Sequence, residues 1–382
     1  MSKFSKSSKK SVSEYREHGK DVVKNFMGGN SYKLDPLNTL RVVASSSIFG
    51  EPSYYRSSHD KISNLGNLIN NDVLGIYTDD VETTTDVFTK AIDESLSYDF
   101  IKTLELAREL RKEYFMRLNP SVIFIRAAQH PNRGEFNKEN PGLMRKIGYD
   151  LIIRPDDITN QFDYYMWLNV TKKGLPSIVK RVWADSLSDF DAYRIKKYKS
   201  KSLVDLVRIS HAKSEVIDEL MTTGDVKVDE KSSTWETLRS KGMGWVDILN
   251  TIKIPHMALL RNLRGIFTEV EDLDLAKDVC ELLKSGVING KQFPFRYYTA
   301  YKALQEGVNH YGLLRDTLEE CMDLSIENTP KLKGKTICLS DNSGSAHGTL
   351  NSEYGSTKVA EIGNLSSIMT SVQSDEGYVG VF

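Results

Sequence analysis

One carboxylate and two hydroxyls stand at alternate positions near the carboxyl end of the chain. They are Asp341, Ser343 and Ser345, a D-x-S-x-S pattern that follows the short apolar run Thr336–Leu339. Carboxylate and hydroxyl oxygens are hard ligands, which Mg²⁺ and Mn²⁺ prefer in proteins. We therefore expect a divalent-cation site at these three residues. The alternative is that the side chains make turn and helix-capping hydrogen bonds.

A cationic segment, residues 180–213, lies in the middle of the chain. It carries nine Lys or Arg residues against four Asp, whereas the whole chain has 51 basic and 52 acidic residues and a net charge of −1. Because a neutral chain has no strong overall field, affinity for a polyanion has to come from such local clustering. Trp183, Tyr193 and Tyr198 lie among the charges, a mixture in which bases stack while cations hold phosphates. The segment predicts a nucleic-acid interface, with a merely solvated surface as the alternative.

An amphipathic helix is expected at the end of this segment. Apolar residues between positions 203 and 210 share one face of the helix, and Arg208 and His211 lie beside each other on its flank. A histidine at that boundary can hydrogen-bond a base or a phosphate. The alternative is a packed core histidine with a backbone partner.

The rest of the composition narrows the class of protein. The three cysteines, Cys280, Cys321 and Cys338, are too few and too far apart for a disulfide framework or a zinc cluster, which favours a reducing cytoplasm. No run of about 18 apolar residues exists and the N-terminus lacks the apolar core of a signal peptide, so we expect no membrane association. No P-loop, paired histidines or Cys/His dyad indicates catalysis, so no enzyme is expected.

Helical periodicity dominates the elements that must position these residues. Residues 1–30, which start with a stretch rich in Ser and Lys, are expected to form a disordered basic tail. Over residues 31–330, apolar residues recur at helical spacing in stretches of about 10 to 18 residues, separated by polar or Gly/Pro breaks. This length matches about six or seven HEAT-type helical pairs, so the chain is predicted to be mainly α-helical.

A different pattern is predicted over residues 331–382. The apolar run Thr336–Leu339 reads as a buried strand, residues 359–372 as a helix, and residues 377–382 as a second strand. Strand, helix and strand in this order begin a parallel α/β sheet. The stretch is too short for a complete domain of that kind, so we expect an incomplete one.

Several motifs occur in an order that resembles the Ro/TROVE family. They are Ala44–Gly50 followed by Tyr54-Tyr55, Lys197-Tyr198-Lys199, Asp205–Lys213 (DLVRISHAK), Thr234-Trp235-Glu236, Met257–Leu263 and Phe293–Tyr297. The D-x-S-x-S pattern then lies where the family has a von Willebrand factor A domain and resembles the metal-ion-dependent adhesion site of such domains. Residues 71–160 match only loosely.

The resemblance implies a ring of HEAT-like repeats followed by the first part of a von Willebrand factor A domain. Family members bind Y RNAs on a basic outer surface and admit the 3′ ends of misfolded RNAs, and bacterial relatives cooperate with an exoribonuclease. A monomer is expected. The implied RNA contacts, the first two by charge alone, are Lys180, Arg181, Lys197, Lys199, Lys201, Arg208, His211 and Lys213.

Two other functions remain open from the sequence. A HEAT-type array can be a protein-binding scaffold, with the cation site holding a carboxylate of its partner. A nuclease that degrades RNA is the second alternative.

Overall fold

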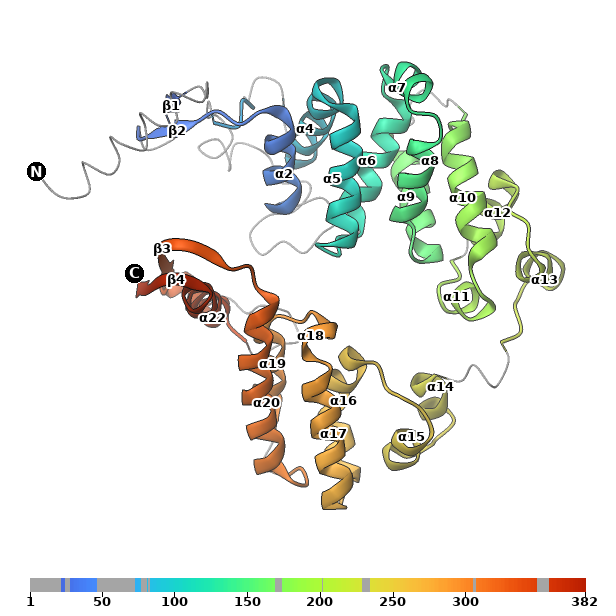
Figure 1. The fold of residues 1–382 in the computed structure, drawn as a ribbon. Helices are drawn as coiled ribbons and strands as arrows, with labels where there is room; N and C mark the ends of the chain where they lie inside the picture. The colour runs from blue at the N-terminus through green and yellow to red at the C-terminus, as the bar shows by residue number, and fades with distance from the viewer. Residues whose placement is uncertain are drawn as a thin grey trace, which may run out of the picture. The chain divides into compact units, whose positions relative to one another are not determined.

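The computed structural model divides into two compact units, Met1–Val228 and Asp229–Phe382, which we describe separately. Both units are mainly α-helical, as the sequence predicts (Figure 1). Most of the predicted tail, the serine-rich motif from residue 47 onward, and Lys201 lie outside the described residues. The structure describes residues 22–24, 28–46, 73–76, 81, 83–168, 174–200, 202–228, 234–304, 307–348 and 357–382.

The first unit begins with a short antiparallel strand pair and continues as packed helices. Its elements are β1 (Val22–Lys24), β2 (Asn30–Tyr32), α2 (Pro36–Ser46), α4 (Thr84–Tyr98), α5 (Phe100–Lys112), α6 (Leu118–Gln129), α7 (Arg133–Glu139), α8 (Leu143–Leu151), α9 (Pro155–Leu168), α10 (Ser177–Asp189), α11 (Ala192–Lys197), α12 (Leu203–Ser210) and α13 (Glu215–Thr223).

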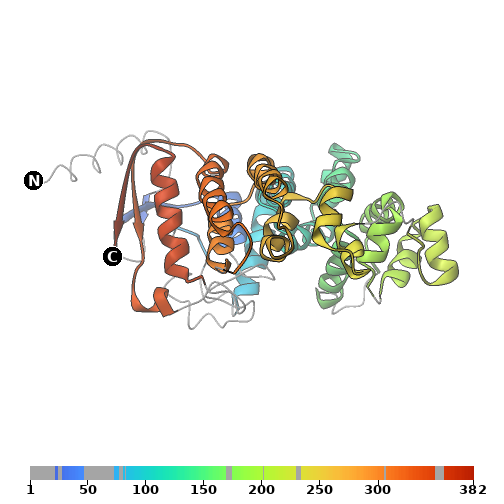
Figure 2. The same cartoon turned by 90° about the horizontal axis from the view of Figure 1, so that it is seen from below.

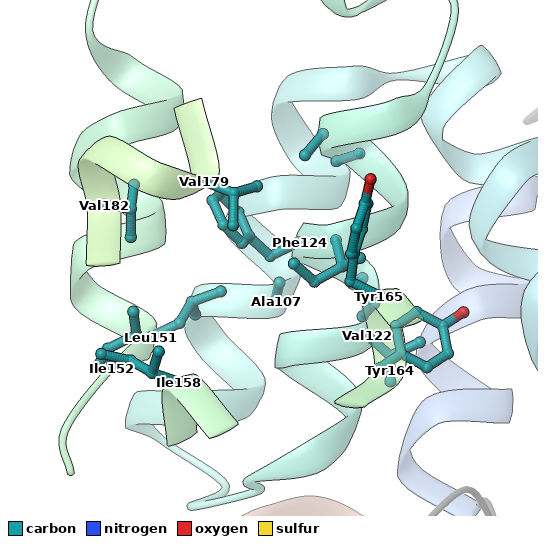
Figure 3. Close-up of a cluster of buried hydrophobic side chains, with 14 of the residues drawn as sticks. Ala107, Val122, Phe124, Leu151, Ile152, Ile158, Tyr164, Tyr165, Val179 and Val182 are labelled. Carbon is teal, nitrogen blue, oxygen red and sulfur yellow. The ribbon is translucent and has the colours of Figure 1, made fainter. Parts of the chain in front are cut away.

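Local sequence sets where several of these helices start. Thr83 and Asp86 form a reciprocal capping box at α4, and the Asp99 side chain accepts from the Lys102 amide at the start of α5. Helices α5, α6, α8, α9 and α10 then stand side by side in Figure 1 and pack against near neighbours in the chain. Their apolar faces meet in one core (Figure 3).

One glycine permits the close approach of α8 to its neighbours. A Cβ atom on Gly148 would lie 2.5 Å from the Phe124 ring of α6 and 3.0 Å from Val182 of α10. Real Cβ atoms do not approach that closely, so the backbone of α8 can lie against both helices only with glycine here.

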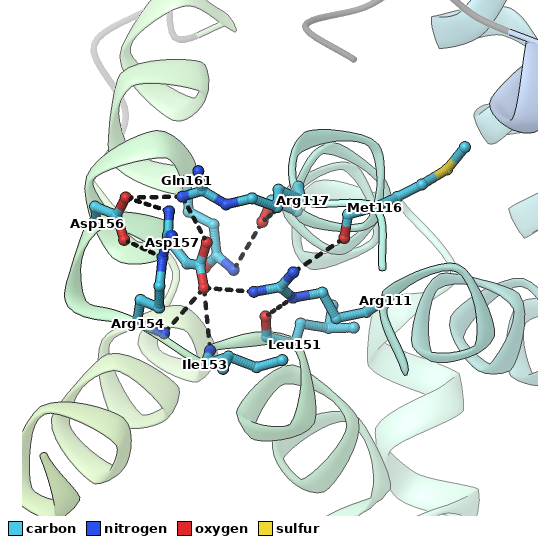
Figure 4. A network of polar contacts seen from close by, with 10 residues as sticks. Arg111, Met116, Arg117, Leu151, Ile153, Arg154, Asp156, Asp157 and Gln161 are labelled. Atoms are coloured by element: carbon cyan, nitrogen blue, oxygen red, sulfur yellow. Dashed lines mark hydrogen bonds and ion pairs between the residues drawn. The ribbon is translucent and has the colours of Figure 1, made fainter. Parts of the chain in front are cut away.

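A buried ion pair joins the ends of three helices in this unit. Arg111 of α5 donates through Nη2 to the Asp157 carboxylate of α9 over 2.8 Å, and both side chains are almost fully buried. The Arg111 Nε also donates to the Leu151 carbonyl at the end of α8. Asp157 accepts from the Ile153 and Arg154 amides as well, so the turn from α8 to α9 folds around its carboxylate (Figure 4).

The second unit has its own helical core. It contains α14 (Trp235–Ser240), α15 (Trp245–Thr251), α16 (His256–Glu269), α17 (Leu273–Ser285), α18 (Val287–Gly290), α19 (Pro294–Ala303), α20 (Tyr311–Ser325), η4 (Ile326–Asn328), β3 (Leu332–Ser340), α21 (Gly344–Gly348), α22 (Val359–Val372) and β4 (Ser374–Val381). Cys280, Cys321 and Cys338 are buried and unbridged. Among the described helices, none is long and apolar enough to span a bilayer.

The predicted order of strand, helix and strand is confirmed, but the expected burial of the first strand is wrong: Ile337 and Leu339 are 63% and 62% exposed, and only Cys338 and Ser340 of this strand are buried. Strands β3 and β4 pair in parallel, with Thr336 opposite Gly377 and Ser340 opposite Val381. Helix α22 packs against both strands, as Figure 2 shows. Lys302 of α19 holds Glu361 at the start of α22 through contacts of 2.8 and 2.9 Å, which ties the α/β segment to the helices of this unit.

We predict that Asp157→Ala lowers the free energy of unfolding by about 3–5 kcal/mol, because it leaves the Arg111 guanidinium buried without its counter-charge. Urea unfolding followed by circular dichroism measures the change. Asp156→Ala is the control: Asp156 is partly exposed and pairs with Arg117 and Arg154, so its loss should cost about 0–1 kcal/mol. Equal losses for the two variants would contradict the role assigned to Asp157.

Candidate nucleic-acid interface

Four helices, α10 to α13, carry the cationic segment predicted from the sequence. Asp191 caps α11 by accepting from the Arg194 amide, and Ser214 caps α13 by accepting from the Ile217 amide. Helix α10 packs against α12 and α13. The cationic residues therefore lie on one group of contacting helices, but their surroundings differ.

Lys196 and Lys199 are held at the end of α13. The Lys199 Nζ donates to the Gly224 carbonyl, and the Lys196 Nζ donates to the Val226 carbonyl over 3.2 Å. Asp225 lies within 4.0 Å of both ammonium groups, and its pKa is lowered by the Val226 amide and then by these lysines. Cations at a helix C-terminus satisfy carbonyls that lack helical partners. The Lys199 side chain therefore stabilises the end of α13. Its predicted contact with RNA stays a prediction.

Lys197 and Arg208 are exposed but have neighbours of their own. The Lys197 Nζ lies 5.3 Å from the centre of the Tyr193 ring and 5.8 Å from that of Tyr198, within cation–π range. Arg208 pairs with Asp205 over 3.2 Å, and both side chains are about two-thirds exposed. Such an exposed pair is weak enough for a phosphate to compete with it.

His211 lies on the surface, so the alternative of a packed core histidine is wrong. The predicted buried face of α12 is confirmed by Leu203, Leu206 and Val207. His211 follows the helix as its C-cap with φ of 61° and ψ of 35°, the left-handed conformation that usually favours glycine. This backbone turns the chain after α12 and leaves the imidazole exposed.

The end of α12 is joined to α10. The Lys213 amide donates to the Ser188 hydroxyl of α10 over 3.2 Å. Arg181 lies seven residues before Ser188, two turns along the same helix face, at an axial distance of about 10 Å. Within the described residues, the side chains of Arg181, His211 and Lys213 have no carboxylate partner. The structure thus places unneutralised cations from separate motifs on neighbouring parts of one surface.

Two arginines that the sequence analysis did not select lie near Arg181. Arg133 of α7 and Arg145 of α8 line a pocket of 420 Å³ together with Arg181 of α10. They lie 36 to 48 residues from Arg181 in the sequence, so no local pattern indicates that the three converge.

Two of the family motifs also converge, in the second unit. Residues 257–263 lie on α16 and residues 293–297 at the start of α19, and both contribute to a pocket of 490 Å³. Apolar side chains such as Leu260 and Ala300 form much of its lining, and Arg261, Arg264 and Arg296 are exposed beside them. The motifs are recognisable in the sequence, but nothing in the sequence indicated a binding role for their arginines.

The D-x-S-x-S residues follow β3 as predicted. Their contacts bear on the two interpretations of this pattern, a divalent-cation site and a set of turn and capping hydrogen bonds. The Ser343 amide donates to Asp341 over 2.8 Å, which lowers the pKa of this exposed carboxyl and forms the predicted turn hydrogen bond. The hydroxyls of Ser343 and Ser345 are hydrogen-bonded to each other at 3.0 Å. Adjacent ligands of an octahedral Mg²⁺ at about 2.1 Å are separated by about 3.0 Å, so the hydroxyl pair fits two ligand positions. Among the described residues, no group of three or more His, Cys, Asp or Glu side chains could hold a metal ion.

We predict that His211→Gly raises the free energy of unfolding by about 0.5–1 kcal/mol. Glycine relieves the left-handed backbone, and this gain exceeds the added entropy of the unfolded chain. Urea midpoints at unchanged m-value measure the effect. His211→Ala, which keeps a Cβ atom, should give no such gain, and a destabilised glycine variant would contradict the helix cap described for this residue.

Comparison with solved structures identifies the fold. The crystal structure of the Ro (Rsr) protein of Deinococcus radiodurans superposes on this chain with a TM-score of 0.54 at 14% sequence identity, covering 76% of this chain and 68% of that one. No protein-family model and no curated protein sequence matches the chain. The expected mainly α-helical, Ro-like repeat fold is therefore confirmed, and the resemblance to the Ro/TROVE family read from the motifs holds at the level of the fold.

Proposed function

We propose that the chain binds small structured non-coding RNA on the surface formed by α10 and α12. One observation carries this proposal. Arg181 on α10 and His211 and Lys213 just after α12 are exposed and have no carboxylate partner within the described residues, and the hydrogen bond from Lys213 to Ser188 joins the two places. When a protein cation without a counter-charge contacts an RNA phosphate, counterions that were condensed on the RNA are released, and this release drives RNA binding. The Ro-like fold supports the same proposal.

The surrounding residues suit a folded RNA with an unpaired end. Lys197 lies over Tyr193 and Tyr198, and Arg154 also lies 4.6 Å from the centre of the Tyr198 ring, so the proposed stacking of a base falls on Tyr193. Trp183, which the sequence suggested for the same role, is fully buried and donates to Gln161 over 2.8 Å, so that suggestion is wrong. The exposed imidazole of His211 can donate to a phosphate or hydrogen-bond a base edge. Lys180, which is half-buried on α10, adds positive charge beside Arg181. Lys199 contributes indirectly by holding the end of α13.

In this proposal the chain is a ribonucleoprotein component in RNA processing or quality control and not itself a nuclease. Y-like RNAs and the 3′ ends of misfolded RNAs are the proposed ligands, and an exoribonuclease is the proposed protein partner.

We further propose that Asp341, Ser343 and Ser345 hold Mg²⁺ or Mn²⁺. The 3.0 Å separation of the two serine hydroxyls and the ionised Asp341 carboxylate support this site. The remaining coordination positions would be taken by water or by an acidic group of a partner.

The RNA proposal predicts that His211→Ala with Lys213→Ala weakens binding about tenfold, because one cation and one base or phosphate contact are lost. Fluorescence anisotropy with a labelled RNA hairpin that has a single-stranded 3′ tail measures the affinity. The slope of log affinity against log salt should decrease by about 1 for each lost phosphate contact. Lys138→Ala is the control, because Lys138 is exposed on α7 of the same unit and outside this surface.

Unchanged affinity and salt slope in the double variant would exclude this surface as the RNA-binding site. If the parent chain fails to bind the RNA even at low salt, a protein-binding scaffold becomes the better explanation of the helical array.

The metal proposal predicts saturable Mn²⁺ binding, measured by electron paramagnetic resonance, that is lost in Asp341→Asn. The amide cannot supply the negative charge that a hard divalent cation requires. Asp278→Asn, which neutralises an exposed carboxylate on α17, should leave Mn²⁺ binding unchanged. Equal binding by both variants would assign Asp341 and the two serines to turn and capping hydrogen bonds alone.

A further inference from the structure

The pocket lined by Arg133, Arg145 and Arg181 lies where α7, α8 and α10 come together in the first unit. Its volume of 420 Å³ is within the range of sites that take small molecules or single nucleotides. The lining consists of Arg133, Asn137, Pro141, Gly142, Arg145, Ser177, Ile178 and Arg181. None of these residues is acidic, so the lining carries three positive charges and no negative one.

The three guanidinium groups keep hydrogen-bond donors for a ligand. Arg145 uses Nε and Nη2 in a forked pair with Asp185, at 2.6 and 2.7 Å, which leaves its Nη1 unused. Arg133 donates through Nη1 to the Ala128 carbonyl, which fixes its side chain and leaves Nε and Nη2. Arg181 has no partner among the described residues. With Asp185 included, the local net charge is still positive.

Two helix starts add to this positive character. Gly142, with φ of 82°, precedes α8, and Pro176 precedes α10, and neither helix has a side-chain cap. The first amides of an uncapped helix have no intrahelical partners, point along the axis out of its N-terminal end, and attract anions. Gly142, Ser177 and Ile178 belong to these starts and line the pocket. Arginine forks and backbone amides together are the donors that bind phosphate best.

We propose that this pocket seats a phosphate group of the RNA that the chain binds. This assignment rests on the proposed function, because Arg181 is shared between the pocket and the α10 surface that leads to His211 and Lys213. Arg181 and Ser188 are about 10 Å apart along α10, so one short stretch of RNA backbone reaches from the pocket to the end of α12. The pocket holds a phosphate at a fixed place and thereby sets the register of the RNA on the surface.

The pocket itself is tested with inorganic pyrophosphate and isothermal titration calorimetry on the full chain. Arg133→Gln with Arg181→Gln should bind pyrophosphate at least about tenfold more weakly than the parent chain, since two charged donors are removed. Lys138→Gln with Lys146→Gln makes the same charge change on α7 and α8 outside the lining and should bind within about twofold of the parent. Circular dichroism and thermal melting check folding. Arg181→Gln alone, which breaks no hydrogen bond or ion pair among the described residues, should still weaken binding.

Two results would overturn the assignment of this pocket as an anion site. One is no pyrophosphate binding by the parent chain, and the other is equal weakening of binding by the lysine pair and the arginine pair of substitutions. Arg181→Lys keeps the charge but loses the fork, so it should bind with an affinity between those of the parent and Arg181→Gln.

Labelled RNA then distinguishes an RNA phosphate from a free phosphate compound. The arginine double variant should bind the RNA hairpin more weakly and with a flatter salt dependence, and pyrophosphate should compete with RNA for the parent chain. Loss of pyrophosphate binding with unchanged RNA affinity overturns the assignment to RNA. If the parent chain binds pyrophosphate but no RNA, the proposed function fails while the anion pocket stands, so the two failures are distinguishable.

Discussion

The buried pair of Arg111 and Asp157 is the interaction on which the first unit depends. It joins the end of α5 to the turn between α8 and α9, and its carboxylate also accepts two backbone amides of that turn. A buried charge tolerates little displacement, because any gap leaves a desolvated ion without its partner. The pair therefore fixes α8 relative to α5, and α8 in turn packs on α10 through Gly148. These contacts therefore set the position of α10, which carries Arg181 and part of the proposed RNA-binding surface.

The structure divides its cations into two groups. Some serve the fold: Arg126 pairs with Asp93, Arg117 with Asp156, and Lys196 and Lys199 hold the end of α13. Others, including Arg181, His211 and Lys213, remain exposed without carboxylate partners within the described residues. Only the second group offers a polyanion a full electrostatic gain, because a paired cation must first give up its partner. Counting charges along the chain cannot make this distinction.

Both units place arginines beside concave surfaces. In the first, Arg133, Arg145 and Arg181 converge from α7, α8 and α10 on a pocket that two uncapped helix starts also line. In the second, Arg261, Arg264 and Arg296 stand along a more apolar pocket between α16 and α19. The first lining suits a phosphate because it carries three guanidinium groups, two of which, those of Arg133 and Arg145, are held in place by hydrogen bonds. The second pocket exposes more hydrocarbon. The two pockets therefore differ in the chemistry that they can recognise.

Hydrophobic periodicity alone determined the helices, the buried face of α12 and the order of strand, helix and strand near the carboxyl end, because these depend on residues a few positions apart. It placed His211 on the flank of α12, whereas His211 follows the helix in a left-handed conformation. The motifs also indicated the Ro-like fold. Tertiary structure decided which cations are neutralised and which converge. Arg145 pairs with Asp185, which lies forty residues later in the chain, and Lys199 donates to the Gly224 carbonyl at the end of α13, twenty-five residues later. Such pairs depend on how helices pack, which is a property of the whole core and leaves no local pattern in the sequence.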